Sequence, residues 1–542
     1  MNQSLRIVLG QIQVSVGDLT GNVDKIIKSA TEARDHLNAD VILFPELSIT
    51  GYSPEDLLRR KAFITATEEA LQTLLQKIKD IYVIVGYAKY DIDGLKNVCA
   101  VLYNGKILAT YAKRSLPNYA VFDEKRYFIP GSDNCVIHIK DIPIGLVICE
   151  DLWQNTEVAE KTIAAGAKLI LSMNASPFEV NKDEMRQTLL TQYGQKHGIP
   201  FLYTNLVGGQ DELVFDGGSL VVNEKGKVVL RADFFHEALL PVTVKYAQGQ
   251  ASIVEEMPLK NYSEEEKTYA CLVTGLRDYI RLNGFSGVLL GISGGIDSAL
   301  TAAIAVDALA PENVHGVLLP SRYTSEMSFD DAIQLINHLN ISHETISIEP
   351  SFEQFLTTLA LTDKPSDITQ ENLQARCRAI ILMALSNQTG KVLLSTSNHS
   401  ELAMGYGTLY GDMAGGFNVL KDVPKTWVYR LARYRNQHSP VIPDRIIEKA
   451  PTAELRHNQK DEDSLPPYDI LDKILALYVR EEKSIAEIVA VGFSEETVRF
   501  IANTLHKSEY KRRQGCTGIK IFPHSFGRER RYPITYVDPE LT

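Results

Sequence analysis

The sequence predicts an α/β protein made of two units in series, and three observations lead to this expectation. Short β-branched strands alternate with helical segments along nearly the whole chain. The first half adds hairpin turns to this alternation, which favours a layered α/β sandwich. The second half contains apolar segments typical of parallel strands in a doubly wound sheet.

Composition excludes several classes of protein. A chain of 542 residues is too long for one core, and about three or four domain equivalents are expected. The net charge of −12 argues against nucleic acid as the main partner, although a local basic site for an anionic ligand stays possible. No run of about eighteen apolar residues predicts a membrane span.

The chain start and the cysteines indicate a reducing compartment. The first ten residues enter a strand at once and lack the apolar core of a signal peptide. Six cysteines are scattered without a C-x-x-C pair, so neither a zinc site nor a disulfide framework is indicated. We therefore expect a cytoplasmic protein.

Strands and hairpins of the first half can be placed from the sequence. Strands are expected at residues 6–10, 41–44, 82–86, 144–148 and 169–172. One hairpin joins residues 98–103 to 106–111 through Asn104-Gly105, a strong type I′ signal. A second joins 219–223 to 228–231 around residues 224–227.

The boundary between the units is expected near residue 245. A polar connection follows, and Ser263 with three glutamates after it forms a good helix N-cap. We therefore expect a first domain at 1–245, a linker at 246–262 and a second domain at 263–542. Further strands are expected at 288–290, 314–319, 344–348 and 392–395. The polar run 457–464, before Pro466-Pro467, fits either a plain linker or a functional lid.

The most informative segment of the second half is GISGGIDS at residues 291–298, between an apolar strand and a helix. Glycines let backbone N–H groups approach a phosphate closely, and the following helix presents its N-terminus to the same anion. Ser293 and Ser298 add hydroxyl donors, and Asp297 offers a hard oxygen ligand for Mg²⁺. An ordinary βα turn is the alternative reading. No Walker G-x-x-x-x-G-K-[ST] sequence occurs.

This segment resembles the SGGxDS loop of the adenylating PP-loop ATPases, which cleave ATP between its α and β phosphates. The resemblance implies an ATP-binding loop formed by Gly291, Ser293, Gly294, Gly295, Asp297 and Ser298.

Three reactive side chains of the first half come at predicted strand ends: Glu46, Lys113 and Cys149. A thiol needs a base and a nearby cation to act as a nucleophile near neutral pH, and an amide substrate needs its oxyanion stabilised. Each residue alone has a structural explanation, because a cysteine after an apolar strand is usually core and a lone lysine or glutamate is usually surface.

The combination F-P-E, A-K-x-x-L-P-N and C-E-D-x-W resembles the nitrilase superfamily over roughly the first 240 residues. The resemblance implies an α-β-β-α sandwich with Glu46 as the base, Lys113 as oxyanion stabiliser and Cys149 as the nucleophile. Glu124 would be a supporting carboxylate.

The first half is most similar to the glutaminase domain of glutamine-dependent NAD⁺ synthetases. That resemblance implies glutamine binding by Tyr52, Tyr119, Ser176 and Lys182. Position 182 carries a lysine where an arginine would be expected, so it offers a point charge and not a bidentate fork.

Segments of the second half resemble the same family, namely E-N-L-Q-A-R-C-R at 371–378, residues 395–401, the glycine-dense 405–418, Lys425 and Lys511-Arg512. The resemblance implies ATP binding by Thr396 and Lys425, and Mg²⁺ binding by Asp297 and Glu401. It places deamido-NAD⁺ at Asn372, Arg376, Glu401, Asp412 and Lys511. Taken one at a time, some of these segments have simpler explanations. The 371–378 segment could be an ordinary basic helix face, the 405–418 segment a tight crossover, and Lys511-Arg512 a solvated helix end.

The resemblance implies ATP-dependent amidation of nicotinic acid adenine dinucleotide (deamido-NAD⁺) with ammonia from glutamine, by a homo-oligomeric enzyme. Three alternatives remain open at this point. They are a PP-loop amidotransferase acting on another acid, a stand-alone nitrilase or carbamoylase with a degenerate second half, and a non-catalytic nucleotide-binding protein. The residues Glu46, Lys113 and Cys149 argue against the first. The intact 293–298 loop, together with Glu401 and Asp412, argues against the second.

Overall fold

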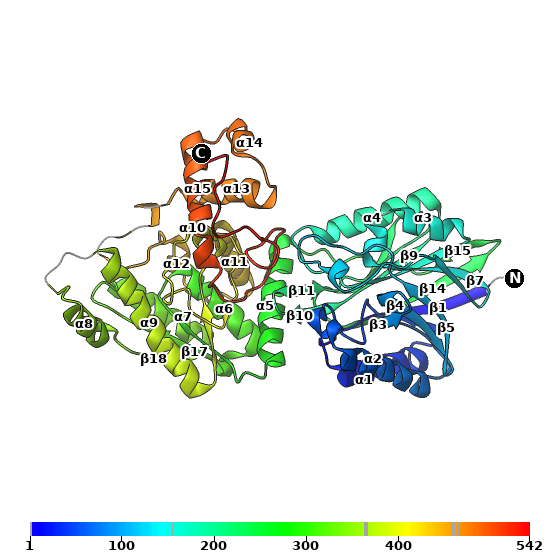
Figure 1. Ribbon diagram of the computed structural model, residues 1–542. Coiled ribbons are helices and arrows are strands. Elements are labelled where there is room, and N and C mark those ends of the chain that lie inside the picture. Colours follow the sequence, from blue (N-terminus) through cyan, green and yellow to red (C-terminus); the bar gives the residue numbers. More distant parts are fainter. Residues whose placement is uncertain are drawn as a thin grey trace. The chain divides into compact units, whose positions relative to one another are not determined.

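The computed structural model describes residues 3–153, 156–362, 367–456, 459, 461–463 and 465–541. The chain forms two compact units, residues 1–262 and 263–542, and each has its own sheets and cores (Figure 1). No helix within the described ranges combines the length and apolarity that crossing a bilayer requires.

Two stacked sheets form the first unit. The seven-stranded sheet has the order β15 (Gln250–Ile253), β14 (Ala238–Ala247), β1 (Gln3–Gln11), β2 (Val41–Leu43), β3 (Tyr82–Asp91), β4 (Gly94–Tyr103), β5 (Lys106–Ala112). The six-stranded sheet has the order β13 (Val228–Arg231), β12 (Leu220–Val222), β9 (Phe201–Asn205), β8 (Leu169–Asn174), β7 (Ile142–Ile148), β6 (Cys135–Ile139). A separate ribbon pairs β10 (Val207–Gln210) with β11 (Leu213–Asp216).

The layers follow from which face each apolar side chain occupies. Ile7, Val101 and Ile144, from β1, β4 and β7, belong to one fully shielded cluster drawn from both sheets. The outer face of the larger sheet packs on α1 (Leu19–Asp35) and α2 (Lys61–Lys77). The outer face of the smaller sheet packs on α3 (Thr156–Ala164) and α4 (Lys182–His197). These helix pairs lie on opposite sides of the unit in Figure 1, so the expected α-β-β-α sandwich is confirmed.

Both predicted hairpins are present. β4 and β5 pair antiparallel across Asn104 and Gly105, whose φ angles of 45° and 81° suit a type I′ turn. β12 and β13 form the second hairpin. One difference concerns the expected linker, because its residues 250–253 form β15 and pair with β14. A polar edge strand resembles a connection because only one side of it needs to be apolar.

The second unit contains a parallel sheet with the order β18 (Ser342–Thr345), β17 (Val314–Leu318), β16 (Val288–Gly291), β19 (Val392–Ser395), β20 (Phe417–Asn418). All four neighbouring pairs are parallel, as a doubly wound sheet requires. The strand order reverses between β16 and β19, which is where such sheets bind ligands. The strand expected at 344–348 lies two to three residues earlier in the structure, because β18 begins at Ser342 and ends at Thr345.

Helices α5 to α16 complete the second unit. α5 begins after Ser263, whose hydroxyl accepts the Glu266 N–H, as the sequence predicts. α9 begins at Ile368, three residues before the 371–378 motif, because Asp367 caps it. The helices are α5 (Glu264–Leu282), α6 (Ile296–Leu309), α7 (Glu326–Leu339), α8 (Glu349–Thr358), α9 (Ile368–Thr389), α10 (His399–Met404), α11 (Lys425–His438), α12 (Asp444–Glu448), α13 (Tyr468–Leu475), α14 (Ile485–Ala490), α15 (Glu495–Lys507) and α16 (Glu509–Arg512).

Candidate active sites

A buried lysine joins two carboxylates in the first unit. Lys113 follows β5, and its Nζ lies 2.7 Å from Glu46 Oε1 and 2.7 Å from Glu124 Oε1. Asn97 also donates to Glu46 Oε1, at 2.7 Å. Glu46 Oε2 has no hydrogen-bond partner among the described residues. This arrangement leaves one carboxylate oxygen free to accept a proton, and it leaves one of the three lysine N–H donors free for a substrate.

Cys149 lies at the end of β7 and opens the short helix η3 (Cys149–Leu152). Its φ of 45° is unusual for a residue with a side chain and is typical of nucleophiles held on a sharp turn. Burial raises the pKa of the thiol well above its ordinary value, Glu46 raises it further, and Lys113 opposes both. The thiol is therefore neutral until a base takes its proton, and Glu46 is close enough to influence it.

Asp151 connects the cysteine turn to the lysine loop, a role that the sequence reasoning did not assign. Its Oδ2 accepts the Ile148 N–H at 2.9 Å and the Tyr111 hydroxyl at 2.7 Å. Its Oδ1 accepts the backbone N–H groups of Arg114 and Ser115. The only sequence signal was an acid two residues after the cysteine. This carboxylate fixes Cys149 relative to Lys113.

The residues expected to bind glutamine surround this centre. Tyr52 is buried, and its hydroxyl donates to Glu124 Oε1 at 2.9 Å. Tyr119 donates to Glu150 Oε2 at 3.0 Å, so Glu150 is a further acidic group beside the cysteine. Lys182 opens α4, lies 3.2 Å from Glu179 and stands over the Trp153 ring. Ser176 is buried after β8, the strand that pairs with β7.

The second unit has a cavity of about 460 Å³ at the carboxyl edge of its sheet. Every residue predicted to bind ATP or deamido-NAD⁺ lines this cavity except Arg376. The predicted residues that line the cavity are Gly291, Ser293, Gly294, Gly295, Asp297, Ser298, Asn372, Thr396, Glu401, Asp412, Lys425 and Lys511. Residues from six separate segments therefore converge on one space.

The 291–298 turn is held open by its own hydrogen bonds. Ser293 Oγ accepts the Gly295 N–H at 3.2 Å and lies 3.1 Å from Ser298 Oγ. Gly294 has a φ of 77°, and a Cβ there would lie 2.2 Å from the carbonyl oxygen of Ser328. A side chain at position 294 is thus excluded by both conformation and space. The turn leads directly into α6, whose N-terminus suits an anion.

Asp297 and Glu401 share one lysine. Lys425 Nζ lies 2.5 Å from Asp297 Oδ2 and 3.3 Å from Glu401 Oε1, while Asn398 donates to the other Asp297 oxygen. Burial and then the Asp297 charge raise the pKa of Glu401 to about 8, against the opposing effect of Lys425. No group of three or more potential metal ligands occurs within the described part of the chain. Two carboxylates beside the 291–298 turn still fit Mg²⁺, which usually keeps water and phosphate oxygens as its other ligands.

Thr408 organises the part of the cavity that Asn372 and Asp412 line. Its hydroxyl donates to Asn372 Oδ1 and its backbone N–H donates to Asp412 Oδ1, both at 2.7 Å. Arg376 points elsewhere, donating to the carbonyl oxygen of Leu409 at 3.2 Å. Arg378, two residues further along α9, lines the cavity. The helical phase, which motif matching ignores, decides which arginine faces the ligand space.

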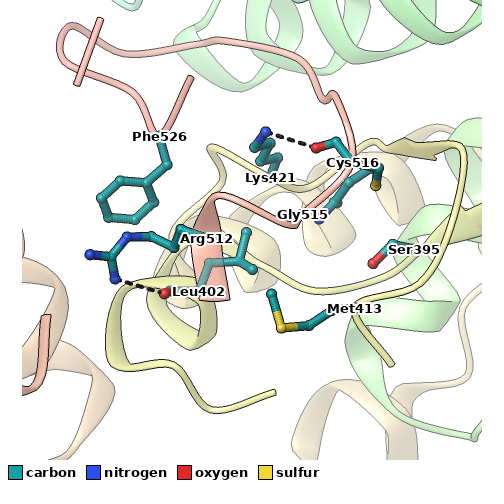
Figure 2. A pocket seen from close by; sticks show the side chains of 9 residues that line it. Ser395, Leu402, Met413, Lys421, Arg512, Gly515, Cys516 and Phe526 are labelled. Carbon is teal, nitrogen blue, oxygen red and sulfur yellow. Dashed lines mark hydrogen bonds between the residues drawn. The ribbon is translucent and has the colours of Figure 1, made fainter. Parts of the chain in front are cut away.

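The two members of the C-terminal basic pair have different surroundings. Lys511 lines the large cavity and donates to the carbonyl oxygens of Gly405 and Gly407. Arg512 lines a separate cavity of about 10 Å³, next to Phe526, and donates to the carbonyl oxygen of Leu402 (Figure 2). That space is about the size of one water molecule. Arg512 is therefore a structural residue.

The predicted loop at 457–464 falls partly outside the described residues, because 457, 458, 460 and 464 are not described. Within the described part, Asp461 is buried, lines the large cavity and accepts the Tyr468 hydroxyl at 2.9 Å. Sequence reasoning assigned no role to Asp461.

Comparison with known proteins agrees with this division into two chemistries. The family model for carbon-nitrogen hydrolases matches residues 6–253, and that for NAD synthase matches residues 268–515. A glutamine-dependent NAD(+) synthetase of Xanthomonas campestris pv. campestris (strain 8004) is 48% identical, covering 98% of this chain and 97% of its own. The chain belongs to the glutamine-dependent NAD(+) synthetase family.

Relatives and solved structures extend the match. The synthetase of Aquifex aeolicus (strain VF5) is 43% identical over 98% of this chain and 99% of its own. The structure of the Acinetobacter baumannii family member, in complex with adenosine diphosphate, has a TM-score of 0.80 at 40% identity and covers 98% of each chain. The expected family and fold class are thereby confirmed, and the protein is a ligase-family enzyme.

Proposed function

We propose that this protein converts deamido-NAD⁺ to NAD⁺, using ATP and the amide nitrogen of glutamine, with AMP, diphosphate and glutamate as the other products. The observation that carries the proposal is the match over 98% of the chain to a glutamine-dependent NAD(+) synthetase. Two separate reactive centres in the chain support the same division of labour.

In the first unit, glutamine is cleaved at Cys149. Glu46 Oε2 takes the thiol proton, and the sulfur forms a bond to the carboxamide carbon. The remaining N–H of Lys113 donates to the oxyanion. The C–N bond then breaks, Glu46 returns its proton to the departing ammonia, and a thioester remains. Glu46 next activates the water that releases glutamate.

In the second unit, the nicotinate carboxylate attacks the α-phosphorus of ATP and displaces diphosphate. Backbone N–H groups of the 291–298 turn and the Lys425 ammonium stabilise the charge that builds on the leaving diphosphate. Ammonia adds to the activated acyl carbon, and AMP leaves. Asp297 and Glu401 would hold Mg²⁺, whose contribution is charge neutralisation on the phosphates.

Deamido-NAD⁺ contacts Asn372, Asp412 and Lys511 in this proposal, and Arg378 contacts it as well. Arg376 acts indirectly, by holding the carbonyl oxygen of Leu409. Thr396 at the end of β19 faces ATP. The family member from Acinetobacter baumannii was solved with adenosine diphosphate, and this supports a nucleotide site in this chain.

The test is a product assay by mass spectrometry with ATP, glutamine and deamido-NAD⁺. NAD⁺, AMP, diphosphate and glutamate should form together. ADP in place of AMP, or no NAD⁺, would refute the proposal. Replacing deamido-NAD⁺ by aspartate or xanthosine monophosphate should abolish AMP release, and AMP release with either acid would favour another amidotransferase.

Location and assembly form a separate part of the proposal. A reducing cytoplasm suits six cysteines that are all free. Apolar side chains exposed on α9, among them Ile380 and Met383, suit a homo-oligomer. A molar mass of one chain in light scattering would refute the homo-oligomer.

A further inference from the structure

Ser176 lies at the same sheet edge as Cys149. Ile148 of β7 pairs with Met173 of β8, so the residues that follow these strands leave the sheet together. Ser176 is buried, with 4% of its surface exposed. Its side chain therefore has little contact with bulk water, and its neighbours decide what its hydroxyl can do.

Arg186 is the neighbour that contacts the Ser176 side chain most directly. This arginine lies one helical turn after Lys182 in α4 and is fully buried. Its Nε and Nη2 lie 3.3 Å and 3.1 Å from Ser176 Oγ. Nη2 also donates at 3.0 Å to the carbonyl oxygens of Ser176 and Pro177.

Asp216 holds the guanidinium in this position. Both of its carboxylate oxygens lie 2.8 Å from Arg186 Nη1. The aspartate ends β11, on the small two-stranded ribbon. A buried arginine charge needs such a partner, and Asp216 fixes the direction of its remaining N–H groups.

Asn205 fixes the backbone of Ser176. Its Oδ1 accepts the Ser176 N–H at 2.9 Å, and its Nδ2 donates to the Ser176 carbonyl oxygen at 3.0 Å. Nδ2 lies 3.3 Å from Asp216 as well. Ser176 is thus held at its backbone by Asn205 and at its hydroxyl by Arg186.

The chemical consequence concerns the hydroxyl proton. A serine hydroxyl has one donor and two acceptor positions. The two guanidinium N–H groups occupy the acceptor side of Ser176 Oγ, so its O–H is left to donate, with the buried Tyr203 hydroxyl as the other polar group beside it. A hydroxyl held as a donor is suited to an anionic oxygen and unsuited to an ammonium group.

We propose that Arg186, clamped by Asp216, is a positioning residue that fixes Ser176 as a hydrogen-bond donor to the α-carboxylate of glutamine. This inference rests on the proposed glutaminase function and adds a specificity device to it. Arg186 does not contact the reacting atoms; it acts through Ser176.

The test compares glutamine with its α-carboxamide analogue, in which the α-carboxylate is replaced by a neutral amide. Ammonia release gives kcat/KM for each substrate, and their ratio measures carboxylate selection. Arg186→Met and Ser176→Ala should each lower this ratio about tenfold or more, the usual effect of a hydrogen bond to a charged group. The double variant should lower it no further than either single change.

Arg186→Lys covers the case in which Arg186→Met fails to fold. Lysine keeps the charge beside Asp216 but lacks the forked N–H groups of a guanidinium. The ratio of the two kcat/KM values should therefore also fall in Arg186→Lys. Leu190→Val is the matched control, since Leu190 lies one turn further along α4 in an apolar cluster. It should lower thermal stability and leave the ratio unchanged.

Three outcomes would overturn the inference. They are an unchanged ratio in Arg186→Lys, equal losses with both substrates in Arg186→Met, and additive losses in the double variant. A wild-type protein that releases no ammonia from glutamine would instead refute the proposed function. NAD⁺ formation from ammonium salts should persist in all of these variants.

Discussion

Lys113 Nζ lies 2.7 Å from Glu46 Oε1, with both side chains shielded from solvent. The same nitrogen contacts Glu124, so one cation faces two carboxylates. If both were ionised, the cluster would carry a net negative charge before the thiol ionised. That charge adds to the effect of burial, which is the largest cause of the raised pKa of Cys149, so proton transfer to Glu46 has to accompany attack.

Replacing the supporting carboxylate tests this electrostatic account. Burial raises the pKa of Glu124 from its ordinary value of 4.5 to about 7, with Lys113 opposing. Between these values the native protein keeps a proton that the unfolded chain has lost, so the free energy of unfolding decreases as pH rises through this window. Glu124→Gln should remove that decrease. Denaturant unfolding across the window checks it, and parallel curves for the two proteins would contradict it.

The glycine at position 294 should be irreplaceable for two reasons. In Gly294→Ala, the alanine has to adopt the left-handed backbone of Gly294, which costs about 1–2 kcal/mol of folding free energy. Its Cβ would also lie 2.2 Å from the carbonyl oxygen of Ser328. Gly284→Ala is the matched control, because its φ of 71° is similar and no atom lies within 4 Å. Gly294→Ala should lose NAD⁺ synthesis with both nitrogen sources, whereas Gly284→Ala should lose only stability. Equal activity in the two variants would contradict the close approach.

Asp297→Asn tests the acidic pair beside Lys425. The amide removes a charge that we assign to Mg²⁺ binding, so synthesis should fall about 10²–10³-fold with either nitrogen source, and more Mg²⁺ should be needed for half-maximal rate. Glutamine hydrolysis at Cys149 should persist. A titration of rate against Mg²⁺ concentration checks this, and an unchanged half-saturation would contradict the assignment.

Much of the architecture could be predicted because its signals are local. Asn104-Gly105 requires a turn with positive φ, Ser263 caps α5, and the 291–298 turn needs its glycines whatever surrounds it. The displaced elements depend on distant partners. β15 forms because β14 offers an edge, and Asp367 starts α9 earlier than the motif at Glu371.

The sites show the same distinction. Glu46, Lys113 and Cys149 could be chosen from their positions at strand ends and from the family resemblance. Asp151, Arg186 and Arg378 could not, since their roles depend on which backbone groups and which helix face the fold brings near. A single sequence does not encode these tertiary contacts as a spacing.

The division of labour between the two units is tested most directly by Cys149→Ala, with Cys99→Ala as the control. Cys99 is another buried cysteine of the same apolar cluster, and its removal should leave synthesis with either nitrogen source intact. Cys149→Ala should abolish NAD⁺ formation from glutamine while NAD⁺ formation from ammonium salts continues at close to the wild-type rate. Equal loss with both nitrogen sources, in a variant that still melts as the wild type does, would contradict the account.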